Sequence, residues 1–493
     1  MSRNINQRQK SAFREIIKGT AIFGGTQMVS MLSGLVRGKF LAIILGAHGM
    51  GVSSLLASAI QPVQQFFAMG LPSAAVSSIA HATDETEQRQ RATALRRSTL
   101  LLALAAAAFL IISASLLSSV TFGTDTDYTL WFAALAAAVF FNMLAACENT
   151  ILQSFRQLKA LALCNIVTAA AGVLISIPIL YVMGIEGIVP SMIVLALVSW
   201  AFARWHTLKL RITTRQQWTT TFALSRKMIM LGMTMMVAAL LGSLSVYAVN
   251  TFINISGTTE HVAFYQTASV ITVQCTTMVF TALATDYYPH LTQVIADRIK
   301  TLRLINQQSQ VVMLLTAPVA ALLMVFAPVV VRVLFTSEFD IIVPLVQMMS
   351  FAFLMRAYYF PLDYICLAKG DKAFFFCIEG IWTNVKMLLL FIGGYHLFGL
   401  SGLGYAAIAN GLLDAVMSTV MVRWRYGVAY SPLTMAVVAV NALLVAAVMA
   451  VTLCVEDNMI KWVAAGVLTL VITINSLIQI KKRTGTWSIR HHR

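Results

Sequence analysis

Charged side chains interrupt several long apolar stretches of this 493-residue sequence. Arg356 and Lys386 lie deepest within such stretches, and Arg37 and Lys39 lie nearer the end of theirs. A charge is costly in apolar surroundings, so a cation there usually faces water, an acidic partner or an anionic ligand. These four residues are the candidate contacts for an anionic group, although Arg37 and Lys39 could also extend outward to a membrane interface.

Five acidic residues also fall within apolar stretches. They have two candidate roles, because an unpaired buried charge is expensive and because a buried carboxylate can carry a proton or cation. They are therefore either counter-charges to the basic residues or sites that couple the protein to a proton or sodium gradient. The five are Glu148, Asp286, Asp363, Glu379 and Asp414.

Aromatic residues cluster near the charges in the region 343–397. Tyr358, Tyr359 and Trp382 are candidates for contacts with sugar rings, whose C–H faces suit aromatic side chains. Ordinary packing between helices is the alternative role for all three.

The apolar stretches set the fold class. Only 11% of the residues are charged and 59% are hydrophobic, whereas a soluble domain is about a quarter charged. The stretches are about as long as the roughly 20 residues that a helix needs to cross a bilayer, which predicts an all-α polytopic protein with about 14 transmembrane helices. The expected spans are 19–46, 50–80, 98–122, 128–152, 161–182, 188–207, 228–255, 262–288, 308–335, 343–368, 374–397, 401–422, 432–454 and 459–480.

Basic residues gather in alternate connections between these spans. If the N-terminus is cytoplasmic, the inner segments hold 29 of the 35 Lys and Arg residues, and the other six lie inside or beside spans. The outer loops hold acids instead, which is the positive-inside pattern. Both termini are therefore expected in the cytoplasm, with the chain in a bacterial inner membrane. The net charge of +16 then reflects topology and affinity for anionic lipids rather than nucleic-acid binding.

The sequence lacks the patterns of an enzyme or a cofactor protein. Its six cysteines form no CxxC or Cys/His cluster, so neither a metal site nor a disulfide framework is indicated. The segment from Gly34 to Phe40 has the wrong spacing for a phosphate-binding loop. We expect no catalytic activity, no cofactor and no metal.

A basic connector at 208–227 divides the chain. Six expected spans precede it in 1–207, six follow in 228–430, and 431–493 adds two helices and a basic cytoplasmic tail. Repeated halves around a central site are common in secondary transporters. We therefore expect two six-helix lobes around a central cavity, with two additional helices at the C-terminus.

Three short motifs resemble those of the multidrug/oligosaccharidyl-lipid/polysaccharide (MOP) exporter superfamily. Leu45–Gly51 is similar to its "LGP-x-G-x-G" turn after the first span, and Leu334–Phe339 to its "LF-x-x-x-F" after the ninth. Asp286–Leu291 resembles the "D-Y/F-x-P-R-L" ending of the eighth span in the polysaccharide-transport branch, with His290 in place of the usual Arg. Together with the span count, the motifs resemble an O-antigen or capsule flippase of the Wzx type.

The resemblance implies a transporter that moves undecaprenyl-pyrophosphate-linked oligosaccharides from the cytoplasmic to the periplasmic leaflet. Glycan polymerases and glycosyltransferases are its implied partners, besides membrane lipid and the lipid-linked substrate. Arg37, Lys39, Arg356 and Lys386 would then bind the anionic head group. Three alternatives stay open: a peptidoglycan-precursor flippase of the MurJ kind, a cation-coupled multidrug antiporter, and a non-transporting scaffold for glycan assembly.

Overall fold

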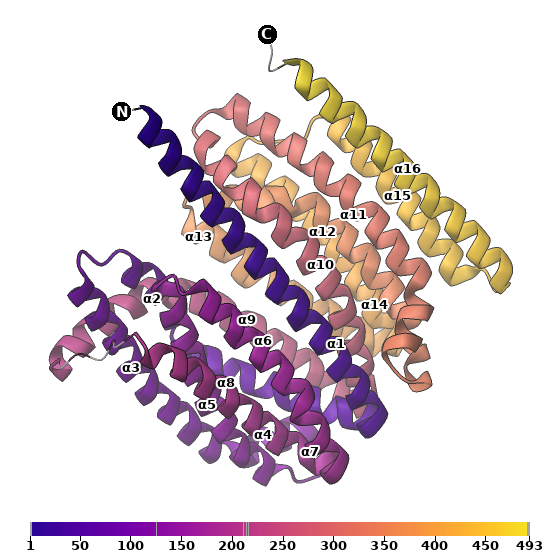
Figure 1. Cartoon of the computed structure of the whole chain (residues 1–493). Helices are drawn as coiled ribbons and strands as arrows, with labels where there is room; N and C mark the ends of the chain where they lie inside the picture. The colour runs from indigo at the N-terminus through magenta and orange to yellow at the C-terminus, as the bar shows by residue number, and fades with distance from the viewer. Residues whose placement is uncertain (1, 125, 211, 213, 215, 491–493) are drawn as a thin grey trace. The chain divides into compact units, whose positions relative to one another are not determined.

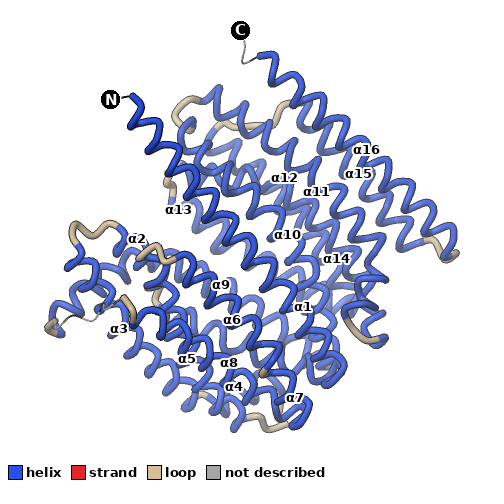
Figure 2. The backbone as a smooth tube through the Cα atoms, in the orientation of Figure 1, coloured by secondary structure: helices blue, strands red, loops and turns tan. Residues whose placement is uncertain are grey.

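The computed structural model describes the backbone of residues 2–124, 126–210, 212, 214 and 216–490. Within them it describes every side chain except those at 2–24, 276, 278, 282, 284–286, 372 and 483–490. This part of the chain consists of helices joined by short turns, and it contains no strand (Figure 2). It divides into two compact units, Met1–Ile255 and Ser256–Arg493.

The first unit is built around α5, which packs side by side with α3 and α8 (Figure 1). Its core consists of apolar side chains with almost no exposed surface, such as Leu56, Leu110 and Phe132. The elements are α1 (Ser2–Ala68), α2 (Leu71–Ala80), α3 (Glu85–Ile112), α4 (Ala114–Phe122), α5 (Thr129–Ser154), α6 (Leu158–Leu174), α7 (Ser176–Met183), the 3-10 turn Gly184–Gly187, α8 (Ile188–Leu208) and α9 (Trp218–Ser256).

The second unit is built around α12, which packs against α10, α11 and α14. The last two helices lie alongside α11 (Figure 1). The elements are α10 (Thr259–Val294), α11 (Arg298–Leu334), the 3-10 turn Ser337–Ile342, α12 (Val343–Ala368), α13 (Lys372–Phe375), the π-helix Phe376–Trp382, α14 (Thr383–Tyr426), α15 (Pro432–Cys454) and α16 (Asn458–Arg490).

Glycines form four of the expected outer turns. Gly46 (φ 64°, ψ −171°) breaks α1, and Gly399 (φ 59°, ψ −139°) breaks α14. Gly123 (φ 80°, ψ −167°) follows α4, and Gly184 (φ 60°, ψ −135°) follows α7. Only glycine adopts a positive φ with an extended ψ at little steric cost, so each turn stops one span and starts the next.

The structure confirms an all-α polytopic membrane protein. Ten described segments are long and apolar enough to cross a membrane. Two of them, Leu158–Leu208 and Ala373–Tyr426, each contain two expected spans separated by a glycine turn, and Gly25–Ala68 covers most of two more in the same way. Helix α10, whose side chains are described in part, lies where the eighth span is expected. Many large apolar side chains are exposed, including Val182 at 83%, as suits helices that face lipid.

The division between the units differs from the expected lobe boundary. We expected the first lobe to end at residue 207, with the connector at 208–227 between the lobes. In the structure α9 belongs to the first unit, where Ser225 is hydrogen bonded to Ser98 at 2.6 Å and Tyr247 to Thr121 at 2.7 Å. Sequence alone does not reveal these contacts, which join helices more than 120 residues apart.

Polar caps begin helices at the expected cytoplasmic loops. The carboxylate of Asp84 accepts a hydrogen bond from the Glu87 amide, and that of Asp297 accepts from the Ile299 and Lys300 amides. Hydrogen bonds from the backbone and the ammonium group of Lys300 hold the pKa of Asp297 below its usual value. These caps satisfy amides at the starts of α3 and α11 that lack a partner within the helix.

Candidate functional site

The deepest charged residues of the second unit lie at one level of the helix bundle. Arg356 is 13 residues from the outer end of α12 at Val343, and Lys386 is 13 residues from the outer break at Gly399. Asp414 lies 15 residues beyond the same break. At 1.5 Å per residue each is roughly 20 Å from the outer end, deep within a hydrocarbon core of about 30 Å.

Lys386 and Asp414 form an ion pair within α14, across the break that folds this helix back on itself. The Lys386 side chain is 4% exposed and that of Asp414 10%. The Lys386 ammonium also donates to the Asn410 carbonyl at 3.3 Å, and the Asn410 amide donates to the second Asp414 oxygen at 3.2 Å. Each buried charge therefore has a compensating partner.

Arg356 differs from Lys386 in being exposed. Its guanidinium carbon lies 5.8 Å from the centre of the Phe280 ring, and it makes no ion pair with a side chain that the structure describes. A guanidinium group presents five N–H donors in a planar fork that matches a phosphate or carboxylate. Arg356 is therefore placed to bind an anion.

Two further acids lie close enough to this cluster for their charges to interact with it. Asp363 accepts a hydrogen bond from the Ser418 hydroxyl at 3.0 Å and lies within electrostatic range of Glu379 and Arg356. Glu379 lies within range of Asp414, Arg356 and Lys386. With all five of these described groups ionised, three acids and two bases leave one excess negative charge.

The π-helix Phe376–Trp382 positions Glu379. The Asn384 amide donates to the carbonyl oxygens of Glu379 at 3.2 Å and Gly380 at 2.7 Å. Single π turns within a helix are frequent at functional sites, because they redirect a side chain without ending the helix.

The three aromatic candidates lie in different settings. The Tyr358 hydroxyl is hydrogen bonded to Thr419 at 2.8 Å, and its ring packs against Tyr430, which fits a packing role. Tyr359 lies within electrostatic range of Asp414 and Arg356. Trp382 is exposed at the end of the π-helix. Of the three, Tyr359 is the one that lies near the charged residues of this cluster.

In the first unit, Arg37 is turned toward the protein. A methyl group added at Gly172 would lie 3.7 Å from the Arg37 Cδ atom, so this side chain lies against α6. Its Nε atom is buried, with no hydrogen-bond partner among the described residues. Arg37 is nine residues from the outer break at Gly46, roughly 14 Å by helix rise. Lys39 is half-buried and engaged with other groups.

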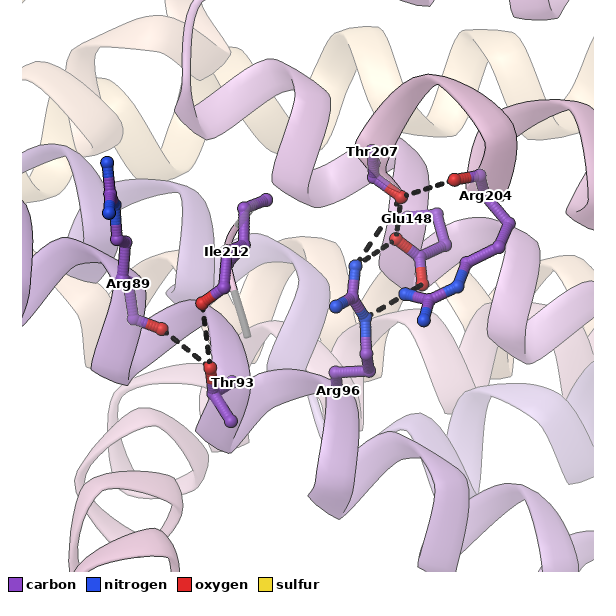
Figure 3. Close-up of polar contacts among 7 residues, drawn as sticks. All are labelled: Arg89, Thr93, Arg96, Glu148, Arg204, Thr207 and Ile212. Carbon is purple, nitrogen blue, oxygen red and sulfur yellow. Dashed lines mark hydrogen bonds and ion pairs between the residues drawn. The ribbon is translucent and has the colours of Figure 1, made fainter. Parts of the chain in front are cut away.

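Glu148 lies in a separate cluster, in which side chains of the first unit donate hydrogen bonds to its carboxylate (Figure 3). Arg96 donates to both its oxygens at 2.9 and 2.8 Å, Arg204 donates at 3.2 Å and the Thr207 hydroxyl at 2.6 Å. These contacts join α3, α5 and α8, which fits the counter-charge role for Glu148. The side chain of Asp286 lies outside the described residues.

Sequence reasoning missed several residues of both clusters. Arg96 and Arg204 fall at the cytoplasmic ends of spans, so they were counted with the basic loops. Asn384 and Asn410 carry no charge and stood out in no pattern. Among the described side chains, no group of three or more His, Cys, Asp or Glu residues is placed to hold a metal ion.

Apolar helices that cross the membrane and carry charged clusters define a multi-pass membrane protein with a transporter fold. The chain belongs to the family of polysaccharide biosynthesis proteins, whose family model matches residues 40–344. The sequence matches no curated protein.

Solved structures with the same fold include transporters of the MOP superfamily. The inward closed conformation of MurJ, described as a lipid II flippase, has a TM-score of 0.69 at 14% identity, over 95% of this chain and 99% of its own. An inward-facing multidrug resistance MATE transporter has a TM-score of 0.67 at 16% identity, over 83% and 95%. A MOP transporter from Pyrococcus furiosus, described as having a binding pocket of reverse polarity, has a TM-score of 0.56 at 14% identity, over 82% and 95%. These likenesses show the fold of MOP exporters.

Proposed function

We propose that this protein is a flippase for undecaprenyl-pyrophosphate-linked oligosaccharide repeat units of an O-antigen, a capsule or a related polysaccharide. It moves them from the cytoplasmic to the periplasmic leaflet of the bacterial inner membrane by alternating access. The observation that carries the proposal is Arg356, an exposed arginine deep in the second unit that makes no ion pair with a described side chain. Membership of the polysaccharide biosynthesis family supports it.

The charged cluster gives each residue a role in this proposal. Arg356 binds the pyrophosphate, because charge-assisted and bidentate hydrogen bonds to phosphate are among the strongest in proteins. Lys386 is neutralised by Asp414, so it shapes the site and adds less to anion binding. Arg37 and Lys39 remain candidate contacts for an anionic group in the first unit, and Asp363 and Glu379 take up the coupling proton or sodium ion. Its proposed partners are glycosyltransferases, which act before this step, and a glycan polymerase, which acts after it.

Replacing Arg356 tests the proposal directly. A hydrogen bond to a charged group contributes about 1.5–3 kcal/mol, so Arg356→Gln should reduce export roughly 10- to 100-fold. Arg356→Lys, which keeps the charge, should retain part of the activity. The measurement is surface glycan together with undecaprenyl-linked repeat units in each leaflet, at matched protein level.

The matched control is Arg332→Gln in the same unit. Arg332 is 72% exposed and paired with Asp340 at 3.2 Å near the outer end of α11, so its loss should leave export unchanged. Normal export by Arg356→Gln at normal protein level would contradict the proposed role of this residue. Normal surface glycan after deletion of the gene, with altered sensitivity to cationic drugs, would favour a multidrug antiporter instead.

A second candidate is a flippase for the peptidoglycan lipid precursor. The likeness to MurJ favours it, because it extends over 95% of this chain and 99% of MurJ. Expression in a strain depleted of its own precursor flippase separates the two candidates. Rescue of growth would support the second candidate, and failure at normal protein level would support the first.

A further inference from the structure

A half-open cavity of about 280 Å³ lies in the first unit, lined by residues of α1, α2, α3, α5 and α9. All the residues that line it belong to this unit. Ligand pockets in proteins begin at about 300 Å³, so the cavity holds one ring-sized group and not a whole oligosaccharide. None of the candidate residues from the sequence lines it.

Polar side chains face this cavity from four helices. Gln64 and Gln65 come from α1, Thr99 from α3 and Asn142 from α5, and Ser73 from α2 adds a hydroxyl. An amide side chain both donates and accepts hydrogen bonds. The Gln64 Nε2 atom is buried and lacks a hydrogen-bond partner among the described residues. The Nε2 atom is covered by protein atoms in this conformation. A buried donor left without a partner is unfavourable, so turning the Gln64 amide into the cavity, toward a ligand that accepts from it, would be favourable.

The rest of the lining is apolar and no lining residue carries a charge. Phe67, Met143 and Met236 lie beside the amides. A charged ligand would lose its hydration here without gaining a counter-charge. An acyl chain would leave the amides and hydroxyls without partners. A sugar ring offers hydroxyl or acetamido groups to the amides, and C–H faces to the aromatic and thioether side chains.

We propose that this cavity is a subsite for one uncharged sugar ring, a hexose or an N-acetylhexosamine. The inference rests on the proposed function in assigning that ring to the transported repeat unit. Gln64 and Asn142 recognise the hydroxyl or acetamido groups, and the cavity admits a neutral ring in preference to a uronic acid. The cavity therefore selects among repeat units, whereas Arg356 binds the pyrophosphate that all such substrates share.

The test measures sugar and head-group binding separately on the purified full-length chain. The sugar probes are the methyl glycosides of glucose, N-acetylglucosamine and glucuronic acid, followed by saturation-transfer NMR. The head-group probe is citronellyl pyrophosphate, followed by calorimetry. We expect a neutral glycoside to bind more strongly than the glucuronide, and Gln64→Leu and Asn142→Leu each to weaken that binding roughly tenfold with citronellyl pyrophosphate binding unchanged.

Two further variants make the result specific. Gln61→Leu is the matched control, since Gln61 is exposed one turn earlier on α1 and does not line the cavity. Ala146→Leu fills the cavity and keeps each amide, so it should also abolish glycoside binding.

Each outcome decides between the two proposals. If no neutral glycoside binds, or if Gln64→Leu, Asn142→Leu and Ala146→Leu bind it as the wild type does, the cavity holds only water and the subsite is disproved. If the glycoside binds in the cavity but citronellyl pyrophosphate does not bind, the subsite stands and the proposed flippase function fails.

Discussion

Lys386 and Asp414 compensate each other inside the membrane-spanning part of the second unit. Removing one partner of a buried pair leaves an uncompensated charge and typically costs about 3–5 kcal/mol, whereas replacing both by apolar residues is often nearly neutral. We therefore expect Lys386→Met to lower the thermal stability of the purified protein strongly, and Lys386→Met/Asp414→Leu to lower it much less. Additive losses in the double variant would show that the two residues do not act as a pair.

Glu148 provides a comparable test in the first unit, because its two arginine partners make different numbers of hydrogen bonds to it. Arg96 makes two contacts with the carboxylate at 2.9 and 2.8 Å, whereas Arg204 makes one at 3.2 Å. Glu148→Gln should destabilise the protein, and Arg96→Gln should do so more than Arg204→Gln, because a bidentate pair is the stronger one. Melting temperatures of the three variants in one detergent give this order. Equal losses for both arginine variants would contradict it.

The sequence identified the charged residues of the second unit but could not pair them. Composition and span length predicted that Arg356, Lys386 and Asp414 lie deep, because depth follows from counting along an apolar helix. Which of these groups bond to one another depends on helix rotation and packing, and on neutral residues such as Asn410. Counting residues along the chain does not give the rotation of a helix about its own axis.

Glycine allows a close crossing between the α1–α2 turn and α9. A methyl group at Gly70 would lie 2.3 Å from the Gly232 carbonyl oxygen, and one at Gly232 would lie 2.5 Å from that of Gly70. Such contacts between backbones occur where small residues let helices approach. Neither position can take a side chain unless the helices move apart.

Gly232→Ala should therefore destabilise the first unit by about 1–3 kcal/mol, the usual cost of overpacking. The matched control is Gly393→Ala in α14, where an added methyl group meets nothing within 4 Å. That change should stabilise the helix by roughly 0.5–1 kcal/mol, because alanine has the higher helix propensity. Thermal unfolding of both variants in detergent measures the difference, and a Gly232→Ala protein as stable as the control would show that the crossing is loose.

The positive-inside pattern makes a prediction for the whole chain. In a cysteine-free background, Thr126→Cys lies in an expected periplasmic loop and Lys209→Cys in the expected cytoplasmic connector. Both positions are exposed, so a membrane-impermeant maleimide added to intact cells should label the first and not the second. Labelling of both in permeabilised cells is the control. The reverse labelling would invert the topology.

The overall architecture could be predicted from the sequence because its determinants are local. Each span needs only a run of apolar residues, and the turns between spans need glycine or a capping residue, as at Gly46 and Asp297. The extent of the first unit could not be predicted in this way. That unit contains contacts such as Ser98 with Ser225, and no local sequence pattern predicts a contact between two serines 127 residues apart.

The order in which the ribosome synthesises the Glu148 cluster has a consequence for membrane insertion. Arg96 precedes Glu148 by 52 residues, and Arg204 follows it by 56. When α5 leaves the translocon, only the earlier cation has been made, and a buried carboxylate without a partner is unfavourable. Helices α3 and α5 should therefore enter the bilayer together as a paired hairpin, with Arg96 acting during biogenesis and Arg204 joining once α8 has been inserted.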